Sequence, residues 1–392
     1  RGTSGLELFT VAGGGPTRGG IESAVRAFFV SGNEFYEVLA GGTSTLRGTL
    51  LTATGVVSIE ENPTQIMITD GVYGYIFNRT TNVFEQITDA AFPTPSDLTY
   101  QDGYFIVTEA EASKFFISGL NNGLTWDALD STTVESSPDN LVGLKSDSSN
   151  LWLFGTKSTE VFRNTGAAAF PFQRISGALI ETGCAAQGTI QELDNALIWL
   201  GTDDNGDSIV WRSNGYNAQR VSTQAIELKI AESTDFTESY SWVYHERGHA
   251  FYMLQVKGLS TTLCLDMSTM AWHERSYRNT LTNAEEQHLG SCHVFFRQLH
   301  LVGDRDSGNI YKMALDVYSD NGDPIVRERV SPHYSEEKRL IPHAQFELDM
   351  ETGVGLNDGQ GIDPQIMLQY SDDGGRTWGD ELWIPMGKIG EY

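Results

Sequence analysis

Hydrophobic and polar positions along the chain repeat one hairpin pattern seven times: an apolar run, a short polar turn and a second apolar run. The paired runs are Ala27 to Val30 with Phe35 to Leu39, Ile66 to Thr69 with Gly74 to Phe77, Tyr104 to Val107 with Phe115 to Ile117, Leu151 to Phe154 with Val161 to Phe162, Ile198 to Leu200 with Ile209 to Trp211, Phe251 to Leu254 with Leu263 to Leu265, and Leu299 to Val302 with Ile310 to Met313. Successive pairs lie roughly 40 to 50 residues apart, the length of one four-stranded sheet in a β-propeller. Because one hairpin cannot bury enough apolar surface to be stable in water, the repeat predicts sheets stacked face to face.

We therefore expect an all-β fold, a β-propeller of seven blades followed by a small C-terminal β domain. Six blades remain an alternative, because the first hairpin, near Phe28, could close the ring with the last strand or lie outside it. The expected organisation is an extended N-terminal segment over residues 1–20, the propeller over 21–315 and a small β-sandwich-like domain over 316–392, for which an incomplete domain is an alternative.

A few segments outside the repeat have a periodicity of their own. Ser222 to Ile230 and Asn283 to His288 have helical character and are expected to connect sheets. In the C-terminal part, Ala344 to Met350 and Gln365 to Tyr370 alternate like strands, and Trp383 begins another strand-like stretch.

The chain is strongly acidic, with 26 Lys and Arg against 52 Asp and Glu and a formal net charge of −26. Such a surface repels phosphate, so general affinity for nucleic acid or anionic lipid is not expected. A well-solvated surface explains the acidity. A wall past which DNA slides without sticking is a second interpretation, and acidity alone does not separate the two.

Three widely spaced cysteines, Cys184, Cys264 and Cys292, form no metal-like cluster and indicate a reducing compartment. Arg1 to Phe9 lacks the charged and apolar blocks of a signal peptide, and the chain has no run of about twenty apolar residues that would predict a membrane span. No cofactor and no metal are expected.

Ser371, Asp373, Gly375, Thr377 and Trp378 match the Asp-box pattern Ser-x-Asp-x-Gly-x-Thr-Trp. The Ser and Asp side chains are expected to cap backbone amides of a tight hairpin, while Gly permits a positive φ and Trp packs over the turn. Asp boxes also occur in sugar-active propellers, but the pattern is a folding device and predicts no catalytic residue. We therefore assign these five residues a structural role.

His245 and His249, with Glu246 between them, match the zinc-protease pattern His-Glu-x-x-His. The pattern binds zinc only on a helix, where residues four apart share one face. Strand-like residues precede and follow it here, and a glycine lies inside it, so we expect a strand, a turn and a strand. A zinc peptidase remains a rival hypothesis that metal analysis can test.

Asp203 to Asp207 forms an acidic loop between two apolar runs. A calcium loop would need further oxygen ligands, so a hairpin turn through Asn-Gly explains it better. The same interpretation applies to Asp304 with Asp306 and to Asp320 with Asp323.

Several stretches carry a distinctive order of residues. They are Phe170 to Phe172 leading through Arg174, Ile175, Gly177 and Ala178 to Gly183 and Cys184; Asp194 to Ala196 leading to Trp199 and Gly201; Ser222, Thr223, Ala225, Ile226 and Glu227; Gly248, His249, Phe251 and Tyr252; and Trp272 to Arg275. With these stretches, residues from roughly 90 to 315 resemble the packaged-DNA stabilisation proteins of short-tailed phages, a tail-hub or head-completion family.

The resemblance implies a non-enzymatic virion protein of the phage tail, assembled in the host bacterial cytoplasm as a homo-oligomeric ring, for which six copies are expected. Such a ring closes the channel of the portal and the head-to-tail adaptor after packaging, retains the genome, and connects to the tail needle and to tailspikes or fibres. DNA passes it without sequence-specific binding, and no membrane is involved. The alternative is a carbohydrate-binding or receptor-recognising Asp-box propeller.

Overall fold

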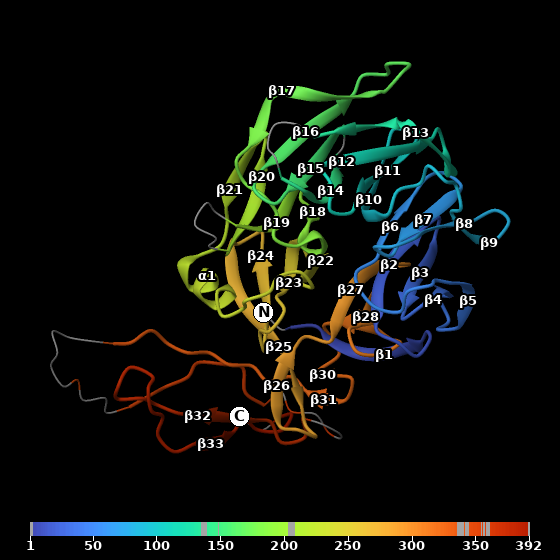
Figure 1. The fold of residues 1–392 in the computed structure, drawn as a ribbon. Coiled ribbons are helices and arrows are strands. Elements are labelled where there is room, and N and C mark those ends of the chain that lie inside the picture. The colour runs from blue at the N-terminus through green and yellow to red at the C-terminus, as the bar shows by residue number, and fades with distance from the viewer. Residues whose placement is uncertain are drawn as a thin grey trace. The chain divides into compact units, whose positions relative to one another are not determined.

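The computed structural model describes residues 3–134, 139–147, 149–202, 208–334, 341, 345–353, 355, 357 and 361–390. The chain divides into two compact units, Arg1–Val326 and Arg327–Tyr392. The first unit is a β-propeller of seven sheets arranged around an axis (Figure 1). The expected seven blades are therefore confirmed, and the six-bladed alternative is wrong.

Blades 1 to 4 each have four antiparallel strands in chain order. Blade 1 contains β2 (Thr17–Ser23), β3 (Arg26–Ser31), β4 (Glu34–Val38) and β5 (Ser44–Thr49). Blade 2 contains β6 (Ser58–Glu61), β7 (Gln65–Thr69), β8 (Gly74–Asn78) and β9 (Val83–Gln86). Blade 3 contains β10 (Pro95–Gln101), β11 (Tyr104–Glu109), β12 (Lys114–Gly119) and β13 (Asn122–Thr133). Blade 4 contains β14 (Leu141–Asp147), β15 (Asn150–Gly155), β16 (Thr159–Asn164) and β17 (Phe172–Ile180).

Blade 5 follows the same plan, whereas blades 6 and 7 have additional strands at their edges. Blade 5 contains β18 (Gln191–Leu193), β19 (Ala196–Thr202), β20 (Ser208–Asn214) and β21 (Asn217–Arg220). Blade 6 contains β22 (Tyr240–Glu246), β23 (His249–Gln255), β24 (Thr262–Asp266), β25 (Ala271–Asn279) and a fifth strand, β26 (Ala284–Gln287). Blade 7 contains β27 (Gly290–Phe296), β28 (Leu299–Asp304), β29 (Asn309–Ala314), β1 (Gly5–Val11) and the short strands β30 (Ser319–Asp320) and β31 (Asp323–Pro324). The helical elements are η1 (Gln187–Thr189) and α1 (Gln224–Ile230).

The seven pairs of apolar runs form the second and third strands of the seven blades, as the sequence predicted. These strands are buried on both faces because a neighbouring blade covers each side. Along β3, Phe28 and Val30 pack toward blade 2, whereas Ala27 and Phe29 pack toward blade 7. Successive side chains of a strand point to opposite faces, so a strand covered on both sides is apolar throughout.

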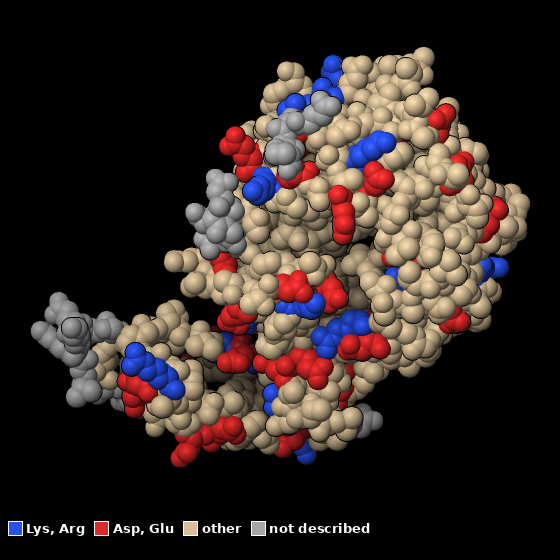
Figure 2. Space-filling model, viewed as in Figure 1, with Lys and Arg blue, Asp and Glu red and all other residues tan. Residues whose placement is uncertain are grey.

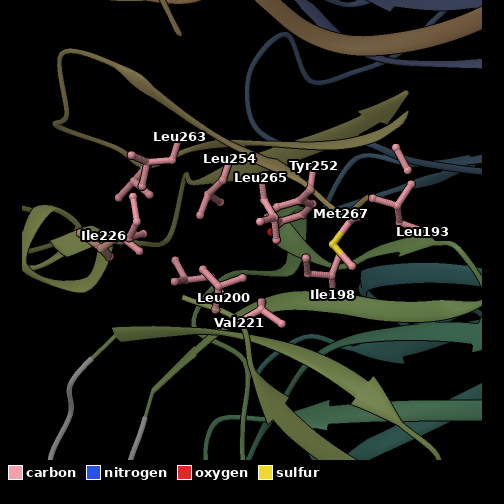
Figure 3. Packing of buried hydrophobic residues seen from close by; sticks show 14 of the residues in the cluster. Leu193, Ile198, Leu200, Val221, Ile226, Tyr252, Leu254, Leu263, Leu265 and Met267 are labelled. Atoms are coloured by element: carbon pink, nitrogen blue, oxygen red, sulfur yellow. The ribbon is translucent and has the colours of Figure 1, made fainter. Parts of the chain in front are cut away.

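Each seam between neighbouring blades has its own hydrophobic cluster, which makes seven clusters for seven seams. Between blades 5 and 6, Ile198 and Leu200 lie opposite Tyr252 and Leu254, and Ile226 of α1 covers one end of the cluster (Figure 3). Stability is therefore distributed around the ring rather than concentrated in one core.

The N-terminal strand closes the ring. β1 pairs antiparallel with β29, with the register running from Gly5 opposite Ala314 to Val11 opposite Asn309. The sequence analysis placed residues 1–20 outside the repeat as an extended segment. In the structure, part of that segment is extended because it supplies the strand next to β29 in blade 7.

One of the two expected connecting helices is confirmed and the other is wrong. Gln224–Ile230 forms α1, but Ala284–Gln287 forms β26, which pairs with β25 from Ser276 opposite Gln287 onward. Asn283 has a positive φ of 56°. That conformation makes a hairpin turn and is incompatible with starting a helix, so β25 continues into a fifth strand.

In the described part of the second unit, β32 (Gln365–Leu368) pairs antiparallel with β33 (Leu382–Pro385). Both strands lie where the sequence predicted strands. The strand expected over Ala344 to Met350 is not found in its described part, residues 345–350, where no other strand pairs with the chain. Within the described ranges, no helix is long and apolar enough to cross a membrane.

Trp199 tests the seam between blades 4 and 5. It is fully buried, its ring centroid lies 5.2 Å from that of Phe154, and its Nε1 donates to the Gly183 carbonyl at 3.1 Å. Trp199→Ala should lower the free energy of unfolding by about 3–5 kcal/mol, measured by urea denaturation. The exposed Leu129 gives the control Leu129→Ala, which should leave stability nearly unchanged. Equal midpoints for the two variants would contradict the seam.

Asp320 makes stability depend on pH at the ring closure. It is buried beside β1, where the Leu6 amide donates to its carboxyl group, and burial raises its pKa to about 7. A raised pKa in the folded state means that the stabilising contribution is complete below about pH 4 and is lost as the pH rises through about 7. Stability should therefore fall between these limits.

Asp320→Asn keeps an acceptor for Leu6 and removes the charge. Its free energy of unfolding should exceed that of the unsubstituted protein by about 1–3 kcal/mol near pH 8 and differ little near pH 4. Denaturant unfolding at both pH values is the measurement, and Asp102→Asn in an exposed turn is the control. A difference that is the same at both pH values would argue against titration of Asp320.

Candidate interaction surfaces

The axis of the propeller is bridged by hydrogen bonds between blades that are not neighbours. Gln187 of η1, at the entry to blade 5, donates from Nε2 to Ser58 Oγ at 2.9 Å and to Asp97 Oδ1 at 3.0 Å. Ser58 Oγ on β6 donates to the same Asp97 oxygen at 2.7 Å. The Leu144 amide in blade 4 donates to Asp97 Oδ2 at 2.9 Å. One carboxylate on β10 therefore connects blades 2, 3 and 4 to the entry of blade 5.

Asp97 is only 6% exposed, and burial raises its pKa to about 6. Its hydrogen bonds with Ser58, Leu144 and the Leu98 amide oppose that shift. All the hydrogen bonds described for the carboxyl group are donated to its oxygens, an arrangement that favours the ionised form near neutral pH. Bonds to an ionised acceptor are short and strong, so the junction holds the four elements firmly together.

An ion pair forms a second bridge near the axis. Lys145 Nζ on β14 lies 2.8 Å from Glu60 Oε1 on β6, although blade 3 separates these strands in the ring. Burial and the nearby charge of Asp147 raise the pKa of Glu192 on β18. The axis thus carries several carboxylates and one lysine. Within the described ranges, no three His, Cys, Asp or Glu side chains are placed to hold a metal ion.

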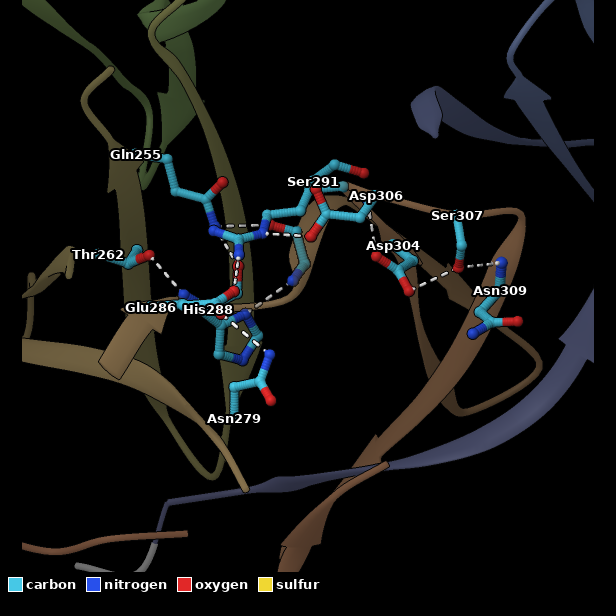
Figure 4. A network of polar contacts seen from close by, with 12 residues as sticks. Gln255, Thr262, Asn279, Glu286, His288, Ser291, Asp304, Asp306, Ser307 and Asn309 are labelled. Carbon is cyan, nitrogen blue, oxygen red and sulfur yellow. Dashed lines mark hydrogen bonds and ion pairs between the residues drawn. The ribbon is translucent and has the colours of Figure 1, made fainter. Parts of the chain in front are cut away.

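In blades 2 and 7, an aspartate stabilises the turn between the second and third strands by accepting a hydrogen bond from a tyrosine hydroxyl. The sequence analysis missed this feature. Asp70 accepts a hydrogen bond from the Tyr75 hydroxyl at 3.0 Å, and Asp304 accepts one from the Tyr311 hydroxyl at 2.6 Å. Asp304 also accepts the Asp306 amide at 2.8 Å, so this loop is a turn, as expected, rather than a calcium loop (Figure 4). The available signal was an aspartate before the second apolar run and a tyrosine within it.

A polar network joins the fifth strand of blade 6 to blade 7 (Figure 4). Gln255 Nε2 donates to the backbone carbonyls of His288 at 2.7 Å and Gly290 at 2.8 Å. Arg305 in the β28–β29 turn donates from Nη2 to Glu286 on β26 at 2.9 Å. These contacts fix the chain where it passes from one blade to the next.

The zinc-protease pattern lies on a hairpin, as expected. Glu246 ends β22 and pairs in register with His249, which begins β23. His245 Nε2 lies 3.2 Å from Asp194 Oδ1, and His249 Nδ1 lies 2.7 Å from Asp266 Oδ2. The two imidazoles contact different carboxylates, Asp194 in the β18–β19 turn and Asp266 at the end of β24, so the hairpin does not present them to a common metal ion.

The Asp-box residues form a network of turn contacts in the second unit. Ser371 Oγ accepts the Gly375 amide at 2.8 Å, and Asp373 Oδ1 accepts the Thr377 amide at 2.8 Å. The Thr377 hydroxyl donates to Asp373 Oδ2 at 2.6 Å, and this bond contributes most to lowering the pKa of Asp373 to about 2. Gly375 has a φ of 87°, and Trp378 is 49% exposed. Both carboxylate oxygens are therefore engaged within the turn.

Other sequence candidates offer no reactive group. The three cysteines are free thiols, and burial raises the pKa of Cys184 and Cys292 to about 12 and that of Cys264 to about 11. The acidic loop Asp203 to Asp207 lies outside the described residues. Asp320 and Asp323 pair across the β30–β31 hairpin, as expected.

Two adjoining hollows open at the seam of blades 6 and 7. The first has a volume of about 410 Å³ and is lined by the β22–β23 turn, the β27–β28 turn and residues around the end of β29. The second has a volume of about 260 Å³ and is lined by residues that include His245, His293 and Phe295. His300 lines both. The first volume lies in the range of ligand pockets.

Charge is mixed over the face of the protein in view. Figure 2 shows Asp and Glu interspersed with Lys and Arg, without a continuous basic stripe. With 52 acidic and 26 basic residues in the chain, this surface lacks the electrostatic footprint of a nucleic-acid-binding protein.

Comparisons with known proteins agree with this description. A family model described as Bacteriophage P22 Gp10, beta-propeller, matches residues 1–318, and a second, described as Bacteriophage P22 Gp10, beta-sandwich, matches residues 326–392. The chain therefore belongs to the Bacteriophage P22 Gp10 family, the packaged-DNA stabilisation or tail-hub family of podoviruses. This is a family of structural phage proteins, and it implies contacts with other virion proteins.

Solved structures support the fold alone. The extracellular domain of a hybrid two-component system from B. thetaiotaomicron matches with a TM-score of 0.52 and 8% identity, covering 79% of this chain and 40% of that chain. A second structure of an extracellular domain from the same organism matches with a TM-score of 0.52 and 7% identity over the same shares. The chain thus spans less than half the length of these structures. No curated protein sequence matches it.

Gln187 tests the axial junction. Gln187→Ala should lower the free energy of unfolding by about 1–2 kcal/mol. The substitution removes the hydrogen bonds that Gln187 Nε2 donates to Ser58 and Asp97, so the buried Asp97 carboxylate loses one of its donors. Hydrogen exchange at the Leu144 amide should become faster. Gln173→Ala on the exposed side of β17 is the matched control. Indistinguishable stability and exchange in the two variants would show that the junction does not hold the axis.

Proposed function

We propose that this phage tail protein is the hub that closes the portal and adaptor channel after DNA packaging. In this role it retains the genome and connects to the tail needle and to tailspikes or fibres. The observation that carries the proposal is the family match over both parts of the chain, residues 1–318 and 326–392. We propose that the protein acts as a homo-oligomeric ring of six copies.

The physical properties of the propeller support this role. Seven packed seams and a bridged axis make a stiff disc, and its turns on both faces can contact several partners. A DNA duplex is far wider than a passage crossed by direct hydrogen bonds. The channel for DNA therefore lies between copies of the protein rather than along the axis of one propeller. An acidic wall lets DNA slide because it offers few Lys and Arg side chains to pair with phosphate.

A non-enzymatic role fits the side chains that resemble catalytic groups. His245 and His249 contact separate aspartates, and Asp373 is engaged in its own turn. The polar side chains described above make contacts between strands and between blades, which is a structural role rather than a catalytic arrangement. We propose that the Asp box stabilises the second unit and does not bind sugar.

The first experiment is nuclease protection of packaged DNA in particles assembled without this protein. Heads that fill and then lose their genome to nuclease are the expected result, because the open channel would release pressurised DNA. Addition of the purified chain in trans should restore protection if the protein itself closes the channel.

Full, stable particles that resist nuclease but fail to attach to cells would contradict the closing role. That outcome would instead move the function to receptor recognition and direct attention to the Asp-box region. Glycan binding that disappears in Trp378→Ala would then distinguish sugar recognition from recognition of a protein receptor.

A further inference from the structure

The β32–β33 pair of the second unit leaves an apolar face uncovered. Ile366 lies opposite Ile384 and Leu368 lies opposite Leu382, so these four side chains project from the same face of the pair. Leu382 is 48% exposed and Ile384 is 56% exposed. A two-stranded hairpin is at best marginally stable in water unless another layer packs against it. This surface, here called the aliphatic face, therefore needs a cover.

Residues 345–350 have the pattern of a covering strand. Apolar Phe346, Leu348 and Met350 alternate with polar residues, so the extended chain has one apolar side and one polar side. In the structure all six residues are exposed and belong to no strand. Phe346 is 66% exposed and Leu348 is 53% exposed. The second unit thus contains an unpaired amphipathic segment as well as an uncovered sheet face.

The segment is held close to its own hairpin and yet does not pack on it. Gly353 donates its amide to the Met386 carbonyl at 3.0 Å, directly beyond the end of β33. The three residues from Met350 to Gly353 span about 10 Å when extended. The aliphatic face of the same chain is therefore within reach, but the segment and the face both remain exposed. This arrangement favours packing between chains over packing within one chain.

A ring of copies needs two different surfaces that fit each other. In a cyclic assembly each interface is heterologous, so one surface of a copy meets another surface of the next copy. The segment and the aliphatic face are such a pair, and exchange of an element between copies is a low-cost route to association. The family model over residues 326–392 is described as a beta-sandwich, a fold that requires two facing layers.

We propose that residues 345–350 of one copy pack as a strand on the aliphatic face of a neighbouring copy, which completes the sandwich of the second unit between chains. Phe346, Leu348 and Met350 face the sheet, while the polar side and the backbone edges of the strand stay in water. This inference rests on the proposed function in taking the protein to form a ring. It deepens that function by assigning the surfaces that join neighbouring copies.

Photo-crosslinking of mixed full chains tests this packing. An unlabelled chain that carries p-benzoylphenylalanine in place of Phe346 is mixed with an excess of ¹⁵N-labelled, unsubstituted chain before association. After irradiation, mass spectrometry should find the unlabelled segment joined to labelled peptides that contain β32 or β33. Crosslinks confined to unlabelled peptides would show packing within one chain and would overturn the proposal. Absence of crosslinks to either hairpin would also overturn it.

Two substitutions separate the apolar side of the segment from its polar side. Phe346→Asp and Gln345→Asp add the same charge at adjacent positions, and neither disrupts a strand because both positions lie outside strands. Phe346→Asp should weaken association about tenfold in analytical ultracentrifugation, because a carboxylate replaces a buried ring. The matched control Gln345→Asp should have little effect. Equal effects of the two substitutions would contradict the proposed orientation.

The salt dependence and the hub role are read separately. Added salt should strengthen association, since it screens the repulsion between chains of net charge −26 and leaves apolar contacts intact. Rings that form with crosslinks elsewhere, or a chain that stays monomeric at every concentration, would overturn this inference. Nuclease protection of packaged DNA would still report on channel closure, so the two failures are distinguishable.

Discussion

Packing between neighbouring sheets is the interaction on which the rest of the structure depends. The central strands of every blade are apolar on both faces, so each blade needs a neighbour on both sides. That requirement cannot be met in an open row of sheets, whose two end faces would remain exposed. The ring must therefore close, and β1 closes it by pairing with β29 far along the chain. Contacts of such large sequence separation tie the two ends of the propeller into one cooperative unit.

Closure leaves an axis that polar groups occupy. Apolar side chains fill the seams, so the first strands of the blades direct their polar groups toward the centre, where Asp97, Gln187 and Lys145 meet. A buried carboxylate that accepts several bonds is stable only if all its donors are held in place. The axial junction is therefore both a product of the ring and a restraint on it.

The surfaces left for partners are the turns and the seams. Tight two-residue turns join strands at Arg247 and at Arg297, and a hollow of about 410 Å³ opens beside them at the seam of blades 6 and 7. A groove at a seam is shaped by two blades at once, so its geometry is set by the packing of the propeller rather than by a mobile loop.

The sequence by itself determined the all-β class, the seven hairpins, the hairpin nature of the His245 segment and the Asp-box pattern, because each is encoded in local periodicity or turn chemistry. Local patterns could not show that Gly5–Val11 completes blade 7, that Asn283 turns into a fifth strand, or that Asp97, Gln187 and Ser58 converge. The pairing of β1 with β29 and the contacts of Asp97 join residues distant in sequence, and only the packing of the closed ring brings them within hydrogen-bonding distance.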